Sequence, residues 1–280
     1  MGAWQAAGPQ AVEPLLQALR DAHREVQVEA LRALGQSGDP RVREPITALL
    51  GDVDADLRSA AASALSDFIE RRVAPRVQAG RDMQTRARRP AGRSLPSLDD
   101  AGIVPPLLAA LPDGQRSVRI SVARALYVFL DDAWVTETLA RSWNDAGEAE
   151  RLLEPLWDEV GSVRAAAAWA LGVARTPHAV EPLLAMLNER NAEVQSRIVW
   201  ALGRIAAPWT VPPLWQGMPN APPPGPWPAS APFALFPDAR IVAALRGMRQ
   251  DEDATVRQQA AAALNRIRLF TGEQRTGAKP

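Results

Sequence analysis

One short pattern recurs along the chain and limits the folds it can adopt. It consists of an apolar residue, usually followed by Arg, then small residues and an Ala-Leu pair. The pattern begins at six anchor residues: Val26, Leu57, Val118, Val163, Val194 and Val256. Successive anchors lie 31, 61, 45, 31 and 62 residues apart, and most of these intervals match one or two copies of 31 to within a residue. A fixed period of this length is typical of repeat proteins.

Each repeat is predicted to be a pair of amphipathic helices. Upstream of four anchors, a proline stands twelve residues and a Leu or Ile eleven residues before the anchor: the prolines are Pro14, Pro45, Pro106 and Pro182. Proline in a first helical turn lacks only an N–H that would have no intrahelical partner, so it favours the start of a first helix. The second helix then carries apolar residues at the anchor, +4 and +8, as at Val163, Ala167 and Leu171.

Composition agrees with a helical chain. Aromatic residues make up only 5% of the sequence, and the 47% apolar fraction is mainly Ala and Leu rather than the β-branched residues that strands prefer. One helix pair cannot bury its own apolar face, so neighbouring pairs must stack. A glycine follows the Ala-Leu pair at Gly35, Gly172 and Gly203, and turns such as Gly38-Asp39-Pro40 are predicted to lead into the next pair.

Charged residues recur in phase with the anchors. Five carboxylates stand five residues before an anchor: Asp21, Asp52, Asp113, Asp158 and Asp251. Four arginines stand one residue after an anchor: Arg58, Arg119, Arg164 and Arg257. Together with the helix-pair pattern, these residues resemble the HEAT repeat, in the short bacterial variety also found in phycocyanobilin lyases.

The resemblance implies an all-α fold, a right-handed α-solenoid of stacked antiparallel helix pairs with about six full HEAT-like units and one degenerate unit. It also implies that the Asp and Arg side chains form a ladder between successive units. Gln27 and Gln195 stand where the other units have Arg, so we expect the ladder to be interrupted there. As exposed pairs, these charges would each contribute no more than roughly 1 kcal/mol.

Three stretches depart from the repeat and define the predicted organisation. HEAT-like units are predicted at 1–70, 103–218 and 238–270. The departures are an Arg-rich insertion at 71–102, predicted to be disordered, a helical insertion at 131–148 within the central units, and a Pro-rich extended segment at 219–237. A disordered tail is predicted at 271–280. Val211-Pro212-Pro213-Leu214-Trp215 predicts a further anchor at residue 225, which is instead Gly225 within the proline run. Polyproline-like chain is therefore expected to replace one second helix, with part of it packed on the solenoid.

The Arg-rich insertion is a candidate electrostatic loop. Between residues 71 and 93 it holds a single acid, Asp82, and eight arginines: Arg71, Arg72, Arg76, Arg81, Arg86, Arg88, Arg89 and Arg93. One interpretation is a solvated, mobile insertion. The other is contact with an acidic partner or with nucleic-acid phosphates.

The second helices carry the candidate binding surface. In resembling solenoids these helices line the concave face, and the positions +3, +6 and +10 from the anchor lie opposite the buried stripe. The candidate partner-binding residues at these positions are Arg124, Trp169, Arg197, Trp200 and Arg204. Trp169 and Trp200 occupy the same position in consecutive repeats, so we expect them side by side, about 10 Å apart. Trp and Arg dominate binding hot spots. In the alternative interpretation both indoles are covered internally, with the Pro-rich segment as one candidate cover.

Catalysis has little support in the sequence. The chain has no Cys and only two His, and it holds no Gly-rich phosphate loop, Gly-x-Ser-x-Gly or His-Glu-x-x-His motif. Lys+Arg and Asp+Glu both total 32, which argues against a groove like that of HEAT-like DNA glycosylases. His23 is followed by Arg24 and His178 by Ala179, which excludes the His-Glu iron site of deoxyhypusine hydroxylase.

The sequence therefore favours a non-catalytic scaffold that binds another protein or a peptide segment on its concave face. We expect a monomer with no cofactor and no metal. We expect no membrane span and a cytoplasmic location, because no 18-residue apolar run or secretory signal is present. Two alternatives stay open. One is a nucleic-acid-binding HEAT-like protein that uses residues 71–93, and the other is a phycobilin-lyase-like enzyme subunit.

Overall fold

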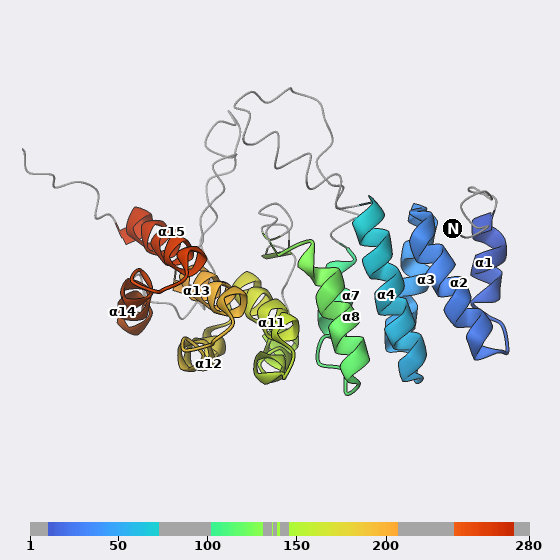
Figure 1. The fold of residues 1–280 in the computed structure, drawn as a ribbon, viewed down its shortest axis with the longest axis horizontal. Coiled ribbons are helices and arrows are strands. Elements are labelled where there is room, and N and C mark those ends of the chain that lie inside the picture. The colour runs from blue at the N-terminus through green and yellow to red at the C-terminus, as the bar shows by residue number, and fades with distance from the viewer. Residues whose placement is uncertain are drawn as a thin grey trace, which may run out of the picture. The chain divides into compact units, whose positions relative to one another are not determined.

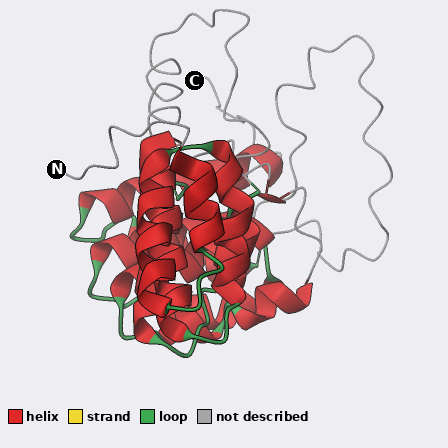
Figure 2. Cartoon of the chain, turned by 90° about the vertical axis from the view of Figure 1, so that its right-hand side faces the viewer, coloured by secondary structure: helices red, strands yellow, loops and turns green. Residues whose placement is uncertain are grey.

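The computed structural model describes residues 11–72, 102–130, 136, 139–140, 146–206 and 238–271. Within these ranges every regular element is a helix (Figure 2). The chain divides into two compact bodies, residues 1–174 and residues 175–280, called here the N-terminal and C-terminal bodies.

The N-terminal body is a row of helix pairs (Figure 1). Its first helices are short: α1 (Val12–Ala18), α3 (Arg43–Ala48) between the 3₁₀ turns Pro40–Val42 and Leu49–Gly51, α7 (Val104–Ala109), and the 3₁₀ turn Glu154–Trp157 that follows α10 (Ala146–Arg151). Its second helices are longer: α2 (Arg24–Ser37), α4 (Ala55–Arg72), α8 (Arg116–Tyr127) and α11 (Gly161–Ala174). α2 packs along α4, α4 along α8, and α8 along α11, so the second helices form one continuous layer.

The C-terminal body repeats the same arrangement. Its first helices are α12 (Val180–Ala185), preceded by the 3₁₀ turn Pro177–Ala179, and α14 (Ala239–Met248). Its second helices are α13 (Ala192–Ala206) and α15 (Ala254–Thr271), which pack closely along each other. The predicted all-α stack of helix pairs is therefore confirmed.

The sequence pattern marks both helices of each pair. The four repeat prolines all occupy the third residue of a first helix: Pro14 in α1, Pro45 in α3, Pro106 in α7 and Pro182 in α12. At that position the missing N–H has no intrahelical partner to lose. All six anchors lie on second helices, and all are fully buried except Val26, which is 40% exposed. Val26 belongs to the first described pair, so no earlier second helix among the described residues covers it.

Two of the repeat glycines, Gly35 and Gly203, serve helix packing rather than turns. Gly35 lies inside α2 and Gly203 inside α13. A Cβ atom on Gly35 would lie only 2.5 Å from the carbonyl oxygen of Ala64 on α4, and one on Gly203 would overlap the Cβ of Ala263 on α15. Glycine is needed at these positions because two helix backbones approach closely there.

The residue that caps a second helix follows the repeat glycine by three positions. Gly38 ends α2 with φ of 67°, in the left-handed region that glycine adopts without a steric penalty. Arg175 holds the equivalent position after α11, with φ of 50°. The same backbone cap is therefore made once by a glycine and once by a residue with a Cβ.

Several predicted segments lie largely outside the described residues. These are the Arg-rich insertion beyond Arg72, the Pro-rich segment 219–237, the first-helix signature at 211–215, and most of the tail at 271–280. Of the helix predicted within 131–148, the structure describes Thr136, Leu139 and Ala140, all helical and buried, and then the start of α10.

Candidate functional site

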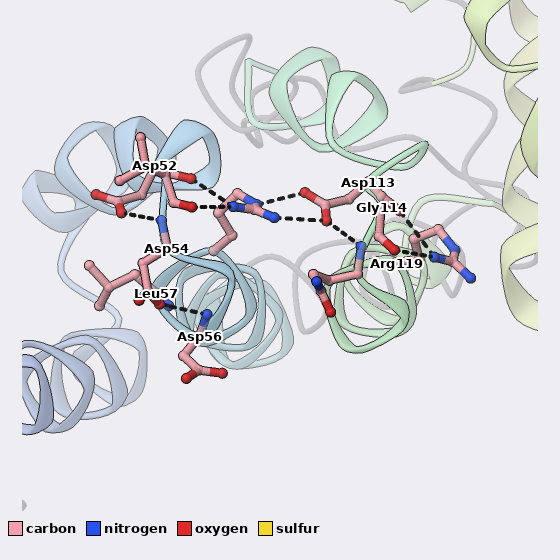
Figure 3. A network of polar contacts seen from close by, with 10 residues as sticks. Asp52, Asp54, Asp56, Leu57, Asp113, Gly114 and Arg119 are labelled. Carbon is pink, nitrogen blue, oxygen red and sulfur yellow. Dashed lines mark hydrogen bonds and ion pairs between the residues drawn. The ribbon is translucent and has the colours of Figure 1, made fainter.

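The predicted Asp/Arg ladder joins neighbouring helix pairs in the N-terminal body (Figure 3). The Arg58 guanidinium donates to both carboxylate oxygens of Asp113 in the next pair, over 2.7 and 3.1 Å. It also donates to the backbone carbonyls of Asp52 and Val53 in its own pair. Arg119 makes the equivalent contacts to the Asp158 carboxylate and to the carbonyl of Asp113. One guanidinium thus fixes its own inter-helix turn and the turn of the next pair.

These ladder pairs are less exposed than expected. The side chains of Arg58 and Asp113 are 17% and 11% exposed, and those of Arg119 and Asp158 are 18% and 6% exposed. Asp113 also accepts a hydrogen bond from the backbone N–H of Gln115. Although burial raises the pKa of Asp113, the hydrogen bonds from Arg58 and Gln115 together hold that pKa below its usual range.

The expected interruption of the ladder at glutamine is correct at one position and wrong at the other. The Gln195 amide still crosses to the next pair, donating to the Asp251 carboxylate over 3.1 Å and to the carbonyl of Leu187. A neutral amide N–H thus donates to the carboxylate that in other units accepts from a guanidinium. The Gln27 amide instead binds two carbonyls of its own turn. Arg24 makes the contact to the next pair there, reaching the Asp54 carboxylate at 2.8 Å.

The five predicted partner-binding residues differ in accessibility. Arg124 is exposed as predicted. Trp200 is half-buried, and the guanidinium of Arg204 lies over its ring, 5.2 Å from the ring centroid. The predicted exposure is wrong for Trp169, Arg197 and Arg204, which are all buried. Trp169 is fully buried, and its indole Nε1 has no hydrogen-bond partner among the described residues.

The burial of Trp169 follows from the helix that carries it. Every residue of α11 from Ala165 to Val173 is buried, and this run contains no polar side chain. A helix that is apolar on all sides is a core helix, whereas the prediction assumed a polar face opposite the buried stripe. Trp169 lies in the N-terminal body and Trp200 in the C-terminal body, so their predicted spacing stays a prediction.

In the N-terminal body, the accessible part of the second-helix layer is formed by α2, α4 and α8. Here the +6 residues, Arg32, Ser63 and Arg124, are all exposed. Neighbouring helices exchange polar contacts across this surface. The Ser63 hydroxyl lies 3.1 Å from that of Ser121, and the Arg124 guanidinium lies 3.2 Å from the Glu70 carboxylate. The structure therefore places these residues together on one face of the N-terminal body.

We define the second-helix face by the positions −1, +3, +6, +10 and +13 on these three helices. Its polar members are Glu25, Glu29, Arg32 and Gln36 on α2; Asp56, Ser63, Asp67 and Glu70 on α4; and Ser117, Ser121 and Arg124 on α8. The sequence-based search singled out Arg124 here, but it missed the carboxylates. The signal that could have found them is the same repeat register, applied to acidic residues as well as to Trp and Arg.

The electrostatic loop is described only at its start. Arg71 and Arg72 are the last residues of α4, and Arg71 is exposed. Arg76, Arg81, Arg86, Arg88, Arg89 and Arg93 lie outside the described residues.

The described ranges hold no group of three or more His, Asp or Glu side chains placed to bind a metal ion. None of their helices is both long enough and apolar enough to cross a membrane.

Comparison with known proteins identifies the family. The family model for HEAT repeats matches residues 12–82 and 149–225, more than half of the chain. The chain belongs to the HEAT repeat family. No curated protein matches it.

Solved structures with a similar fold are repeat proteins. An engineered protein is 22% identical, with 93% of this chain and 97% of that protein covered and a TM-score of 0.58. A computationally designed armadillo repeat protein for modular peptide recognition is 19% identical, with 91% and 99% covered and a TM-score of 0.56. A designed armadillo repeat protein in complex with the peptide (KR)4 is 17% identical, with 91% and 99% covered and a TM-score of 0.53. These similarities support the repeat fold of this HEAT protein.

Proposed function

We propose that this HEAT repeat protein is a non-catalytic scaffold that binds a segment of another protein on the second-helix face. The observation that carries the proposal is the contrast between second helices. On α2, α4 and α8 the +6 side chains are exposed, whereas Trp169 at the same position of α11 is fully buried. Three neighbouring helices thus offer solvent a surface that the fold itself leaves uncovered.

The chemistry of this face suits a peptide ligand. Hydroxyl, guanidinium and carboxylate groups alternate across it, and these groups bind backbone amides and charged side chains. Arg24 joins the α2 pair to the α4 pair through Asp54, and Arg58 joins the α4 pair to the α8 pair through Asp113, so the face is already organised before a ligand binds. The designed armadillo proteins with a similar fold were made for peptide recognition, which supports the same class of ligand here.

The test is affinity capture from the source lysate with a bulky side chain placed on the face. Ser63→Trp fills the centre of the second-helix face, and because Ser63 is exposed the core is unchanged. The matched control is Ala109→Trp, at an exposed position on the first helix α7. Nuclease treatment separates protein partners from partners held by nucleic acid.

We expect one or more partners that survive nuclease, are lost with Ser63→Trp and are retained with Ala109→Trp. Partners that ignore both substitutions would place the binding surface elsewhere on the chain. Capture that disappears with nuclease would instead support nucleic-acid binding, and it would overturn the proposal.

A further inference from the structure

We infer that the ligand of the second-helix face is a segment of another protein that binds in the polyproline II conformation and carries Arg or Lys side chains at intervals of three residues. This inference rests on the proposed function and names the chemistry of the partner.

Carboxylates outnumber cations on the second-helix face. The acidic members are Glu25, Glu29, Asp56, Asp67 and Glu70, and the basic members are Arg32 and Arg124. Arg71 follows Glu70 at the end of α4 and limits the acidic surface on that side. The net charge of the face is therefore negative over α2 and over the start of α4.

The face already shows how it binds a guanidinium group. Arg124 reaches from α8 to α4, where it lies 3.2 Å from the Glu70 carboxylate and 3.7 Å from that of Asp67. Arg32 pairs with Glu29 on its own helix. These two arginines occupy three of the carboxylates; Asp67 is half-buried, and the other side chains are exposed.

The remaining two carboxylates form the docking row. Neither Glu25 nor Asp56 has a hydrogen bond or ion pair to its carboxylate among the described residues, and both are exposed. In Figure 3 the Asp56 carboxylate points away from the ladder formed by Asp52, Asp113 and their arginine partners. Glu25 and Asp56 both precede an anchor by one residue, so they hold equivalent positions on the adjacent helices α2 and α4.

The spacing of the two helices sets the register of the ligand. Packed helices lie about 8–10 Å apart. Polyproline II chain has three residues per turn and rises about 3.1 Å per residue, so side chains three residues apart point to the same side and lie about 9 Å apart. A peptide in this conformation that crosses α2 and α4 can therefore place two side chains three residues apart over Glu25 and Asp56, and Arg or Lys is the complementary residue.

The test measures binding of a synthetic peptide to the full chain. The probe is fluorescein-labelled (Arg-Ala-Ala)5, and (Glu-Ala-Ala)5 is its charge-reversed control, each titrated by fluorescence anisotropy at two salt concentrations. The test variant is Glu25→Gln/Asp56→Asn. The matched control is Glu13→Gln/Glu44→Gln, which removes the same charge from exposed positions on the first helices α1 and α3.

We expect the basic peptide to bind and the acidic peptide not to bind, with affinity falling as salt is raised. Each exposed ion pair contributes up to about a fivefold change in affinity, so the test variant should bind about tenfold more weakly and the control variant unchanged. Equal losses in both double variants would show attraction by overall charge alone and would overturn the inference. Absence of binding to the basic peptide would do the same.

One further variant tests whether the ligand comes from another protein. The chain carries six arginines between residues 73 and 93, and all six are replaced by Gln in the full chain. Unchanged affinity for the probe supports a partner from outside the chain. A gain of tenfold or more would show that the chain's own segment competes for the face, and it would overturn the assignment to another protein. If Ser63→Trp removes a captured partner but the basic peptide does not bind, the scaffold proposal stands and this inference fails.

Discussion

Substitution of Gly35 by Ala tests whether close helix contact sets the stability of the repeat stack. A Cβ at this position would lie 2.5 Å from the carbonyl oxygen, 2.8 Å from the Cα and 3.0 Å from the carbonyl carbon of Ala64. All three are backbone atoms, so no side-chain rotation relieves the overlap and α2 must move away from α4. Overpacking of this kind costs about 1–3 kcal/mol. A contact of 2.5 Å with a backbone atom places this cost at about 3 kcal/mol, the upper end of that range. Glycine to alanine inside a helix offsets about 1 kcal/mol of it, so the net destabilisation is about 2 kcal/mol.

The matched control is Gly247→Ala in α14, where no atom lies within 4 Å of the added Cβ. Here only the helix-propensity term acts, so stability should rise by about 1 kcal/mol. Urea unfolding followed by circular dichroism should therefore separate the two variants by about 3 kcal/mol, with opposite signs relative to wild type. Gly35→Ala as stable as Gly247→Ala would refute the reasoning.

A rescue experiment refines the same point. At Gly203 the nearest atom to an added Cβ is the Cβ of Ala263, a side-chain atom, so Ala263→Gly should restore part of the stability lost in Gly203→Ala. At Gly35 the overlap is with backbone, so Ala64→Gly should not rescue Gly35→Ala. Equal rescue at both positions would contradict the geometry of the two contacts.

Three further predictions concern the ladder and one helix cap. Arg58→Ala should lower the free energy of unfolding by about 2 kcal/mol, because it leaves the half-buried Asp113 carboxylate without its cation. Thermal unfolding measures this loss. A loss below about 0.5 kcal/mol would mean that the pair is no stronger than a surface ion pair. The lowered pKa of Asp113 stabilises the folded state above the unfolded-state pKa of about 3.9, and this stabilisation is lost as pH falls through the lower folded-state pKa. Between about pH 5 and pH 2 the unfolding midpoint of Asp113→Asn should therefore fall less steeply with pH than that of wild type. Equal slopes would contradict the assignment. Arg175→Gly should be about 1 kcal/mol more stable than Arg175→Ala, because both lose the half-buried side chain but only glycine adopts a φ of 50° without strain, and equal calorimetric midpoints would count against it.

The sequence was sufficient to predict the helix pairs and the ladder because both follow the repeat period. The anchor phase placed Arg58 and Asp113 in neighbouring pairs, and they are hydrogen-bonded across that boundary. The period also placed the prolines in first helical turns. The role of Gly35 was not predicted, because a glycine late in a helix has the same sequence appearance whether it ends the helix or admits a neighbour.

The candidate surface was predicted only in part. Assigning one face of every second helix to solvent treats all repeats as equal, and Arg124 agrees with that assumption. Trp169 does not, because the surrounding run of alanines gives α11 no polar side to leave exposed. The burial of Arg197 and Arg204 could not be predicted from the sequence pattern, since guanidinium groups at such positions are usually solvated. Burial of individual repeats depends on what packs against each one, and periodicity carries no information about that.

Site-specific photo-crosslinking tests most directly whether the second-helix face binds a partner. A benzophenone amino acid replaces Ser63 in one full-length variant and Ala109 in the other, and both are irradiated in the source cells. A protein partner crosslinked from position 63 and absent from position 109 is the predicted result. Crosslinks to a partner from position 109 alone, or the same products from both positions, would contradict the scaffold function assigned to this face.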